Sequence, residues 1–256
     1  MSFKIESYGM SNVGMKRFQN EDSYLINNEI GLYIVADGMG GHLGGEYASK
    51  LAVKTVEGWI EKFNGDPDAT QITGVNTQDA DIGDQLRYAI QEASRRIYQE
   101  AHANEKYQGM GTTTVATMLD GENLYIANVG DSRAYLVRDN EIKQLTEDHS
   151  LVSEQIKAGV ISEADARGHK LKNIITRSVG YQEDVDTDIT MHQVKTDDKI
   201  LLCSDGLSNL VEDDEIRQVV GDNDLPEACE QLIKLANSRG GDDNITVIIL
   251  HIDEDF

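Results

Sequence analysis

The stretch GLYIVADGMGGH, residues 31–42, ends a short β-favouring run in an acidic, glycine-rich turn. Aspartate is a poor strand residue, so Asp37 is expected where the strand over residues 31–36 gives way to the turn. Three further acidic motifs stand in comparable places, at the end of a predicted strand or the start of a turn. They are Asn20-Glu21-Asp22, Ser204-Asp205-Gly206 and Gly241-Asp242-Asp243-Asn244.

Carboxylates gathered at the mouth of one sheet would repel one another. At an effective dielectric constant of ~20, two like charges ~4 Å apart cost roughly 4 kcal/mol. A fold that keeps such a cluster needs something to offset the repulsion, and divalent cations held by oxygen ligands do so in proteins. The four motifs therefore predict an enzyme with a metal site.

Composition bounds the class of protein. The chain has 256 residues, of which 39% are hydrophobic and 27% charged, which suits one large soluble domain or two small ones with a sizeable core. Its formal net charge is −23. Binding to nucleic acid or to an anionic membrane requires basic patches, so this charge argues against both partners.

The two cysteines, Cys203 and Cys229, lie in apolar contexts. They are expected to be buried thiols in a reducing compartment, because two isolated cysteines favour neither a disulfide nor a thiolate metal site. The first residues lack the apolar core of a signal peptide, and no apolar run approaches the ~18 residues of a membrane span. The expected location is the cytoplasm.

Hydrophobic spacing predicts the order of the elements. The predicted strands cover residues 3–9, 22–26, 31–36, 112–119, 123–128, 134–137, 142–145, 188–194, 199–203 and 244–252. The predicted helices cover residues 46–63, 84–105, 151–159, 162–167, 213–220 and 226–238, and an exposed polar loop covers residues 64–83. Antiparallel sheets with segregated helices, an α+β fold, suit this order better than repeated βαβ units.

In this order and context, five separated blocks resemble the type 2C metal-dependent protein serine/threonine phosphatases, and in particular their compact bacterial members. The blocks begin at residues 12–22, NVGMKRFQNED, and end at residues 241–247, GDDNITV. Also matching are residues 37–42, Gly111-Thr112-Thr113 and Val129-Gly130-Asp131-Ser132-Arg133. The resemblance implies a four-layer α-β-β-α sandwich, one catalytic domain over residues 1–256, and a flap over about residues 147–180.

The resemblance also implies a site for two Mn²⁺ or Mg²⁺ ions, at one end of the sandwich between the sheets. Asp37 matches the carboxylate that bridges the two ions, with the Gly38 carbonyl as a further oxygen ligand. A glycine suits that role because its backbone can approach an ion closely. Asp205 and Asp243 match the remaining ligands of the first ion.

The block that contains Glu21 and Asp22 matches the ligands of the second ion. One of the two would bind directly and the other through a water, and the sequence leaves open which. Bacterial members of the family can hold a third ion, and Asp131 together with Asp205 matches that site.

Two residues match the groups that handle the substrate. Arg17 resembles the phosphate-binding arginine, whose planar guanidinium pairs two phosphate oxygens. His42 matches the general acid that would protonate the leaving serine or threonine oxygen, a role that suits a group titrating near neutral pH.

Plain structural interpretations compete with these roles. Arg17 could be a surface arginine, His42 a loop histidine in a glycine-rich turn, and Asp131 a turn residue that caps backbone N–H groups. Arg133 and Arg177 are expected to be ion-pair partners of nearby acids rather than substrate contacts.

The resulting hypothesis is a Mn²⁺- or Mg²⁺-dependent hydrolase of phosphoserine and phosphothreonine in proteins, monomeric, that opposes a serine/threonine kinase of the same cell. One alternative is a catalytically weak signalling or binding module on the same fold, and another is a hydrolase of small phosphoesters. The flap is expected to govern substrate choice, and the acidic surface favours basic sequence around the phosphosite.

Overall fold

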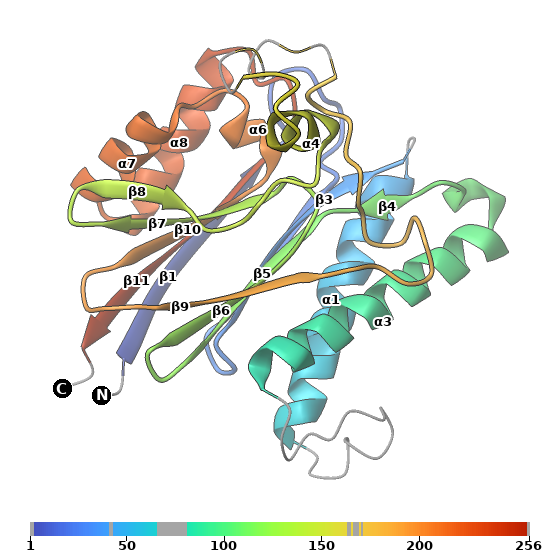
Figure 1. The fold of residues 1–256 in the computed structure, drawn as a ribbon, viewed down its shortest axis with the longest axis horizontal. Coiled ribbons are helices and arrows are strands. Elements are labelled where there is room, and N and C mark those ends of the chain that lie inside the picture. Colours follow the sequence, from blue (N-terminus) through green and yellow to red (C-terminus); the bar gives the residue numbers. More distant parts are fainter. Residues whose placement is uncertain are drawn as a thin grey trace.

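Two antiparallel sheets face each other at the centre of the molecule (Figure 1). The computed structural model describes residues 3–40, 43–65, 81–162, 165, 169 and 171–254. The first sheet has the order β1 (Phe3–Asn12), β11 (Ile245–Glu254), β10 (Lys199–Cys203), β7 (Arg133–Arg138) and β8 (Glu141–Gln144). The second has the order β2 (Asp22–Asn27), β3 (Leu32–Met39), β5 (Thr114–Asp120), β6 (Asn123–Val129) and β9 (Asp188–Gln193), and β4 (Gly111–Thr112) pairs with β3.

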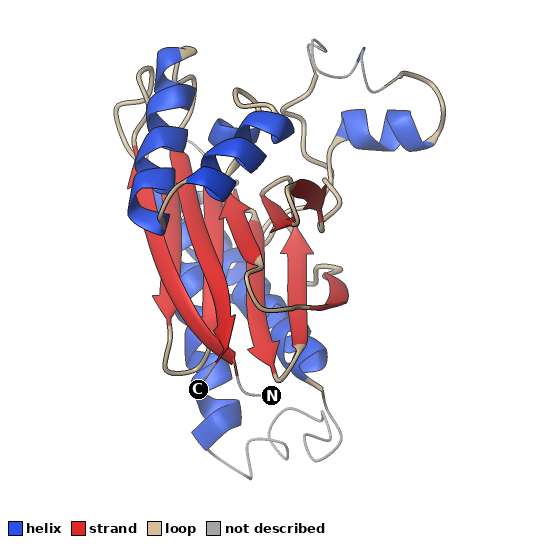
Figure 2. Cartoon of the chain, turned by 90° about the vertical axis from the view of Figure 1, so that its left-hand side faces the viewer, coloured by secondary structure: helices blue, strands red, loops and turns tan. Residues whose placement is uncertain are grey.

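Helices cover the outer face of each sheet, which makes four layers (Figures 1 and 2). The second sheet packs against α1 (Gly44–Gly65) and α3 (Ile82–Ala103), and the first against α7 (Asp213–Asp222) and α8 (Leu225–Ser238). Three short helical segments complete the described elements: η1 (Glu105–Tyr107), α4 (Leu151–Lys157) and α6 (Asp205–Ser208). The predicted α+β sandwich is therefore confirmed.

Burial on both faces explains the unbroken apolar run in β3. Tyr33 and Val35 point into the layer between the two sheets, while Leu32, Ile34 and Ala36 pack against the helices outside. All five are at most 1% exposed. A strand buried on both faces must be apolar throughout. The first polar residue after the run, Asp37, therefore marks the end of the buried part of β3.

Two hairpins join consecutive strands, with β5 paired to β6 and β7 paired to β8. The two long helices begin slightly earlier than their spacing suggested, at Gly44 and Ile82, and α6 was not predicted at all. The predicted helix over residues 162–167 and the polar loop over residues 64–83 fall largely outside the described residues.

Cys203 and Cys229 are both buried and unpaired, as expected. Burial raises the pKa of each thiol to about 12, which keeps both protonated and unreactive at neutral pH. Within the part of the chain that the structure describes, no helix is long and apolar enough to cross a membrane.

Candidate active site

Strand ends bring the acidic motifs together at one end of the sandwich. Asp22 at the start of β2 lies in register with Asp37 near the end of β3. Asp205 follows β10 directly, and Asp243 stands just before β11, the neighbour of β10. Because β11 begins at the acidic motif and runs to the carboxyl terminus, this cluster lies at the end of the sheets opposite the termini (Figure 1).

Asp22 ties the two sheets together. Its Oδ2 accepts hydrogen bonds from Ser204 Oγ at 2.8 Å and from Thr246 Oγ1 at 2.6 Å. Its Oδ1 is buried without a hydrogen-bond partner. Burial raises the pKa of Asp22 to about 7, although the two hydroxyls act against this, and the charges of Asp205 and Asp243 raise it further.

Three further carboxyls share this dehydrated, electronegative region. Burial, followed by the charge of Asp22, raises the pKa of Asp37 well above its ordinary value. Burial and the charge of Asp205 raise the pKa of Asp131 to about 8. Burial and the charge of Asp243 raise the pKa of Asp205 to about 6. Raised pKa values in one place mean that each carboxylate lacks a sufficient positive charge from the protein.

The Asp205 carboxylate is only partly satisfied. Its Oδ2 accepts a hydrogen bond from Asn209 Nδ2 at 2.9 Å, one helical turn further along the chain. Its Oδ1 is buried and has no partner. Asp22 and Asp205 therefore each present one bare oxygen, which is the type of donor that divalent cations prefer.

Gly38 allows the strand to pass very close to its neighbours. A Cβ at this position would lie 2.1 Å from the carbonyl oxygen of Gly45 and 2.6 Å from that of Glu21. The Gly38 N–H also donates to the Glu21 carbonyl at 3.2 Å. Any side chain would force these backbones apart, so the glycine keeps Glu21 next to the strand end that carries Asp37.

Arg17 faces the acidic cluster from the β1–β2 loop. Its guanidinium donates to Asp243 Oδ2 at 2.7 Å, and the side chain is half exposed. Burial would lower the pKa of Arg17, but the charge of Asp243, with Glu21 and Asp37 further away, raises it overall. A permanent cation thus stands at the solvent side of the carboxylates.

Asn244 was not singled out in the sequence, yet it joins the two outer motifs. Its Oδ1 accepts from the Glu21 N–H at 2.7 Å, and its Nδ2 donates to the carbonyls of Val13 and Gln19 at 2.9 and 3.0 Å. The β1–β2 loop is therefore fixed against Asp243. The signal was an asparagine directly after an acidic turn, a position that favours side-chain to backbone bonds.

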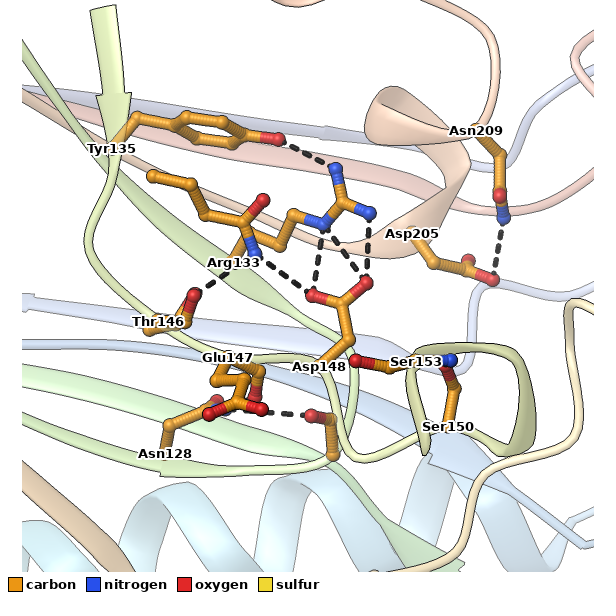
Figure 3. A network of polar contacts seen from close by, with 12 residues as sticks. Asn128, Arg133, Tyr135, Thr146, Glu147, Asp148, Ser150, Ser153, Asp205 and Asn209 are labelled. Carbon is orange, nitrogen blue, oxygen red and sulfur yellow. Dashed lines mark hydrogen bonds and ion pairs between the residues drawn. The ribbon is translucent and has the colours of Figure 1, made fainter. Parts of the chain in front are cut away.

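A second polar network borders the cluster (Figure 3). Arg133 donates to both oxygens of Asp148, at 2.9 and 2.7 Å, and to the Tyr135 hydroxyl at 2.8 Å. This confirms that Arg133 is an ion-pair partner, as is Arg177, which donates to Asp188 at 2.6 Å. The network lines a cavity of about 560 Å³ that also includes Asp131, Asp205 and residues of α4.

Charge and chemistry both suit the site to a cation. In the described part of the chain, no group of three or more His, Cys, Asp or Glu side chains stands at the spacing that holds an ion. The donors are nevertheless all oxygens. Burial and the neighbouring carboxylates raise the pKa values of the carboxyls, and one oxygen each of Asp22 and Asp205 lacks a hydrogen-bond partner. Such a donor set fits Mn²⁺ or Mg²⁺. His42 lies outside the described residues.

Comparison with known proteins agrees with this fold and site. The family model for protein phosphatase 2C matches residues 9–245, and the chain belongs to this family. The serine/threonine phosphatase stp of Listeria welshimeri is 40% identical, over 96% of this chain and 91% of the relative. The protein phosphatase PhpP of Streptococcus pneumoniae is 37% identical, over 96% of this chain and 97% of the relative.

Solved structures give the same result. The serine/threonine phosphatase PstP/Ppp of Mycobacterium tuberculosis superposes with a TM-score of 0.87 at 31% identity, covering 98% of this chain and 99% of the other. A PstP catalytic domain in complex with two manganese ions superposes with a TM-score of 0.85 at 30% identity, covering 99% and 100%. The chain is accordingly a protein-serine/threonine phosphatase of the bacterial type.

Proposed function

We propose that this phosphatase hydrolyses phosphoserine and phosphothreonine in proteins with a metal-activated water, and that it reverses the action of a serine/threonine kinase. The observation that carries the proposal is the cluster of buried carboxyls with raised pKa values beside a permanent cation, Arg17. When bound, two divalent ions supply a nucleophilic water at neutral pH and positive charge against the phosphate.

The contacts of Asp22 indicate which of Glu21 and Asp22 binds the second ion directly. Its Oδ2 already accepts from two hydroxyls, so only Oδ1 is open. We therefore assign Glu21 as the direct ligand and Asp22 as the one that acts through a water. Asp37 would bridge the two ions, with the Gly38 carbonyl as a further ligand.

The remaining carboxylates divide between the first ion and a third. Asp205 and Asp243 would complete the first ion. Asp131 would hold the third with Asp205, because burial and then the charge of Asp205 raise the pKa of Asp131, and both side chains line the same cavity. This assignment supplies the positive charge that Asp131 and Asp205 lack in the protein alone.

Two side chains would act on the substrate itself. Arg17 can turn its guanidinium from Asp243 toward the phosphate oxygens, because half of its side chain is exposed. His42 would donate a proton to the leaving serine or threonine oxygen. In this proposal the catalytic domain spans residues 1–256, acts as a monomer in the cytoplasm, and uses the flap over residues 147–180 to select phosphoproteins.

The direct test is hydrolysis of a phosphothreonine peptide by the purified protein, first with Mn²⁺ and then with excess EDTA. Phosphate release that requires Mn²⁺, or Mg²⁺ in a parallel series, is the expected result. Because both cysteines are buried with raised pKa values, thiol-blocking reagents should leave the rate unchanged. Release that persists in EDTA would contradict the proposed chemistry.

Metal affinity should depend on pH. Metal ions bind carboxylates, and the pKa values of Asp205, Asp22 and Asp131 are about 6, 7 and 8 in the metal-free protein. Ions must displace protons from these groups at pH 6 but much less at pH 8, so the affinity for Mn²⁺ should rise by about tenfold per pH unit for each displaced proton. Calorimetry in two buffers of different ionisation enthalpy measures the protons released, and a pH-independent affinity would refute the prediction.

A further inference from the structure

His149 clamps the turn that carries Asp131. The residue opens the flap and its side chain is only 7% exposed. The Gly130 N–H donates to His149 Nδ1 at 3.0 Å, and the His149 N–H donates to the Gly130 carbonyl at 2.9 Å. Both backbone polar groups of Gly130, its N–H and its carbonyl, are therefore bound by a single residue.

These contacts determine which ring nitrogen carries the proton. Nδ1 accepts from a backbone N–H, so it has no hydrogen and the proton sits on Nε2. Nε2 then donates to Asp188 Oδ2 at 3.1 Å. Arg177 NH1 donates to the other Asp188 oxygen at 2.6 Å, and it lies 3.2 Å from Nε2. Asp188 thus accepts from both the imidazole and the neighbouring guanidinium.

The turn is also tied to the backbone of Asp37 on its other side. Gly130 has a φ of +108°, and a Cβ there would lie 2.6 Å from the Cβ of Thr113. Thr113 Oγ1 accepts from the Asp37 N–H at 3.0 Å and bonds Ser132 Oγ at 2.7 Å. Asp131 therefore lies between two residues that are fixed, one by His149 and one through Thr113 to Asp37.

The same histidine belongs to the root of the flap. The Thr176 N–H donates to the His149 carbonyl at 2.8 Å, and the Leu151 N–H donates to the Ile174 carbonyl at 2.8 Å. A bridge between Ser150 and Ile175 completes this pairing of the two flap ends. A displacement of the flap root would thus be transmitted through the imidazole to the Asp131 turn.

We infer that His149 is a positioning residue that couples the flap root to the Asp131 carboxylate and so governs ion binding there. The inference rests on the proposed role of Asp131 as an ion ligand. It assigns distinct tasks to the two ring nitrogens: Nδ1 holds the turn, and Nε2 anchors the ring to Asp188.

Two near-isosteric variants separate these tasks. In His149→Asn, the side-chain oxygen can replace Nδ1 as the acceptor for Gly130, whereas in His149→Gln the amide nitrogen can replace Nε2 as the donor to Asp188. Each variant keeps one side-chain hydrogen bond and loses the other. The melting temperatures of both variants in EDTA should therefore fall by similar amounts. Mn²⁺ binding, measured by calorimetry, should differ between them.

For His149→Asn we expect a Mn²⁺ affinity within about threefold of the wild type. For His149→Gln we expect the most weakly bound Mn²⁺ ion to bind about tenfold more weakly, because one hydrogen bond contributes about 1 kcal/mol. Equal Mn²⁺ binding by the two variants would overturn the inference. If the wild type releases phosphate and His149→Gln binds Mn²⁺ as tightly as the wild type, the coupling is refuted and the proposed function stands. A wild type that binds no Mn²⁺ would refute the proposed function as well.

Asp188→Ala provides an independent test if the histidine variants fail to fold, because the Asp188 side chain is 44% exposed. Without the carboxylate, Arg177 can donate to Nε2, which favours the tautomer protonated on Nδ1. That tautomer cannot accept from Gly130. We expect a change in the imidazole ¹⁵N shifts together with about tenfold weaker Mn²⁺ binding, whereas an unchanged tautomer with unchanged binding would overturn the inference.

Discussion

Replacing Asp205 by asparagine is expected to lower kcat/KM for a phosphothreonine peptide by about 10³-fold in saturating Mn²⁺. Metal ions stabilise transition-state charge by several kcal/mol, and a loss of roughly 4 kcal/mol corresponds to a factor of about 10³. The variant keeps the shape of the side chain, and its oxygen can still accept from Asn209. Steady-state kinetics over a range of Mn²⁺ concentrations provide the measurement.

The same variant should be more stable than wild type when metal is removed. A carboxyl whose pKa is raised by folding destabilises the folded state increasingly as the pH rises above the unfolded pKa, and fully once the pH exceeds the raised value. Because the pKa of Asp205 is about 6, the gain in unfolding free energy should reach up to about 3 kcal/mol at pH 8 and vanish at pH 4. In Mn²⁺ this gain should largely disappear, because an ion at 100 times its dissociation constant stabilises the wild type by about 2.7 kcal/mol.

Urea unfolding at both pH values, with EDTA or Mn²⁺, measures these differences. Asp222→Asn is the matched control, because it removes one charge from an exposed position at the end of α7. The control should change neither the activity nor the response to Mn²⁺. A destabilised Asp205→Asn in EDTA, or one with wild-type activity, would show that Asp205 is not a metal ligand.

The sequence predicts the frame of the site well because its signals are local. The apolar run that ends at Asp37 is required by burial on both faces of β3, and the same rule locates Asp205 after β10. Strand ends at one edge then bring the motifs together. The spacing of the apolar residues therefore predicts the α+β order of elements and the strand ends that carry the acidic motifs, whereas the four layers followed from the family resemblance.

Contacts that depend on distant residues could not be predicted in this way. Ser204 and Thr246 bind Asp22 across the interface of the two sheets, and no local pattern indicates which hydroxyl meets which carboxylate. Nor does a local pattern pair His149 with Gly130. A weak signal was available, since Gly130 and His149 flank the β7–β8 hairpin and hairpin closure brings its flanks together.

Arg17→Ala is expected to raise KM for phosphopeptides more than it lowers kcat, with a loss of about 10- to 100-fold in kcat/KM. Charge-assisted hydrogen bonds contribute about 1.5–3 kcal/mol, and a group that binds phosphate equally well before and during reaction affects mainly KM. Arg17→Lys retains the charge without the planar fork, so an intermediate loss is expected.

The ion pair with Asp243 raises a competing explanation, that Arg17 acts through the metal ligand. Removing a cation 2.7 Å from Asp243 leaves that carboxylate more negative, so Mn²⁺ should bind as tightly as in wild type or more tightly. A substrate role therefore predicts a raised KM that excess Mn²⁺ does not repair. Recovery of activity at high Mn²⁺ would place Arg17 in the metal site, and a fall in kcat at constant KM would assign its contact to the transition state alone.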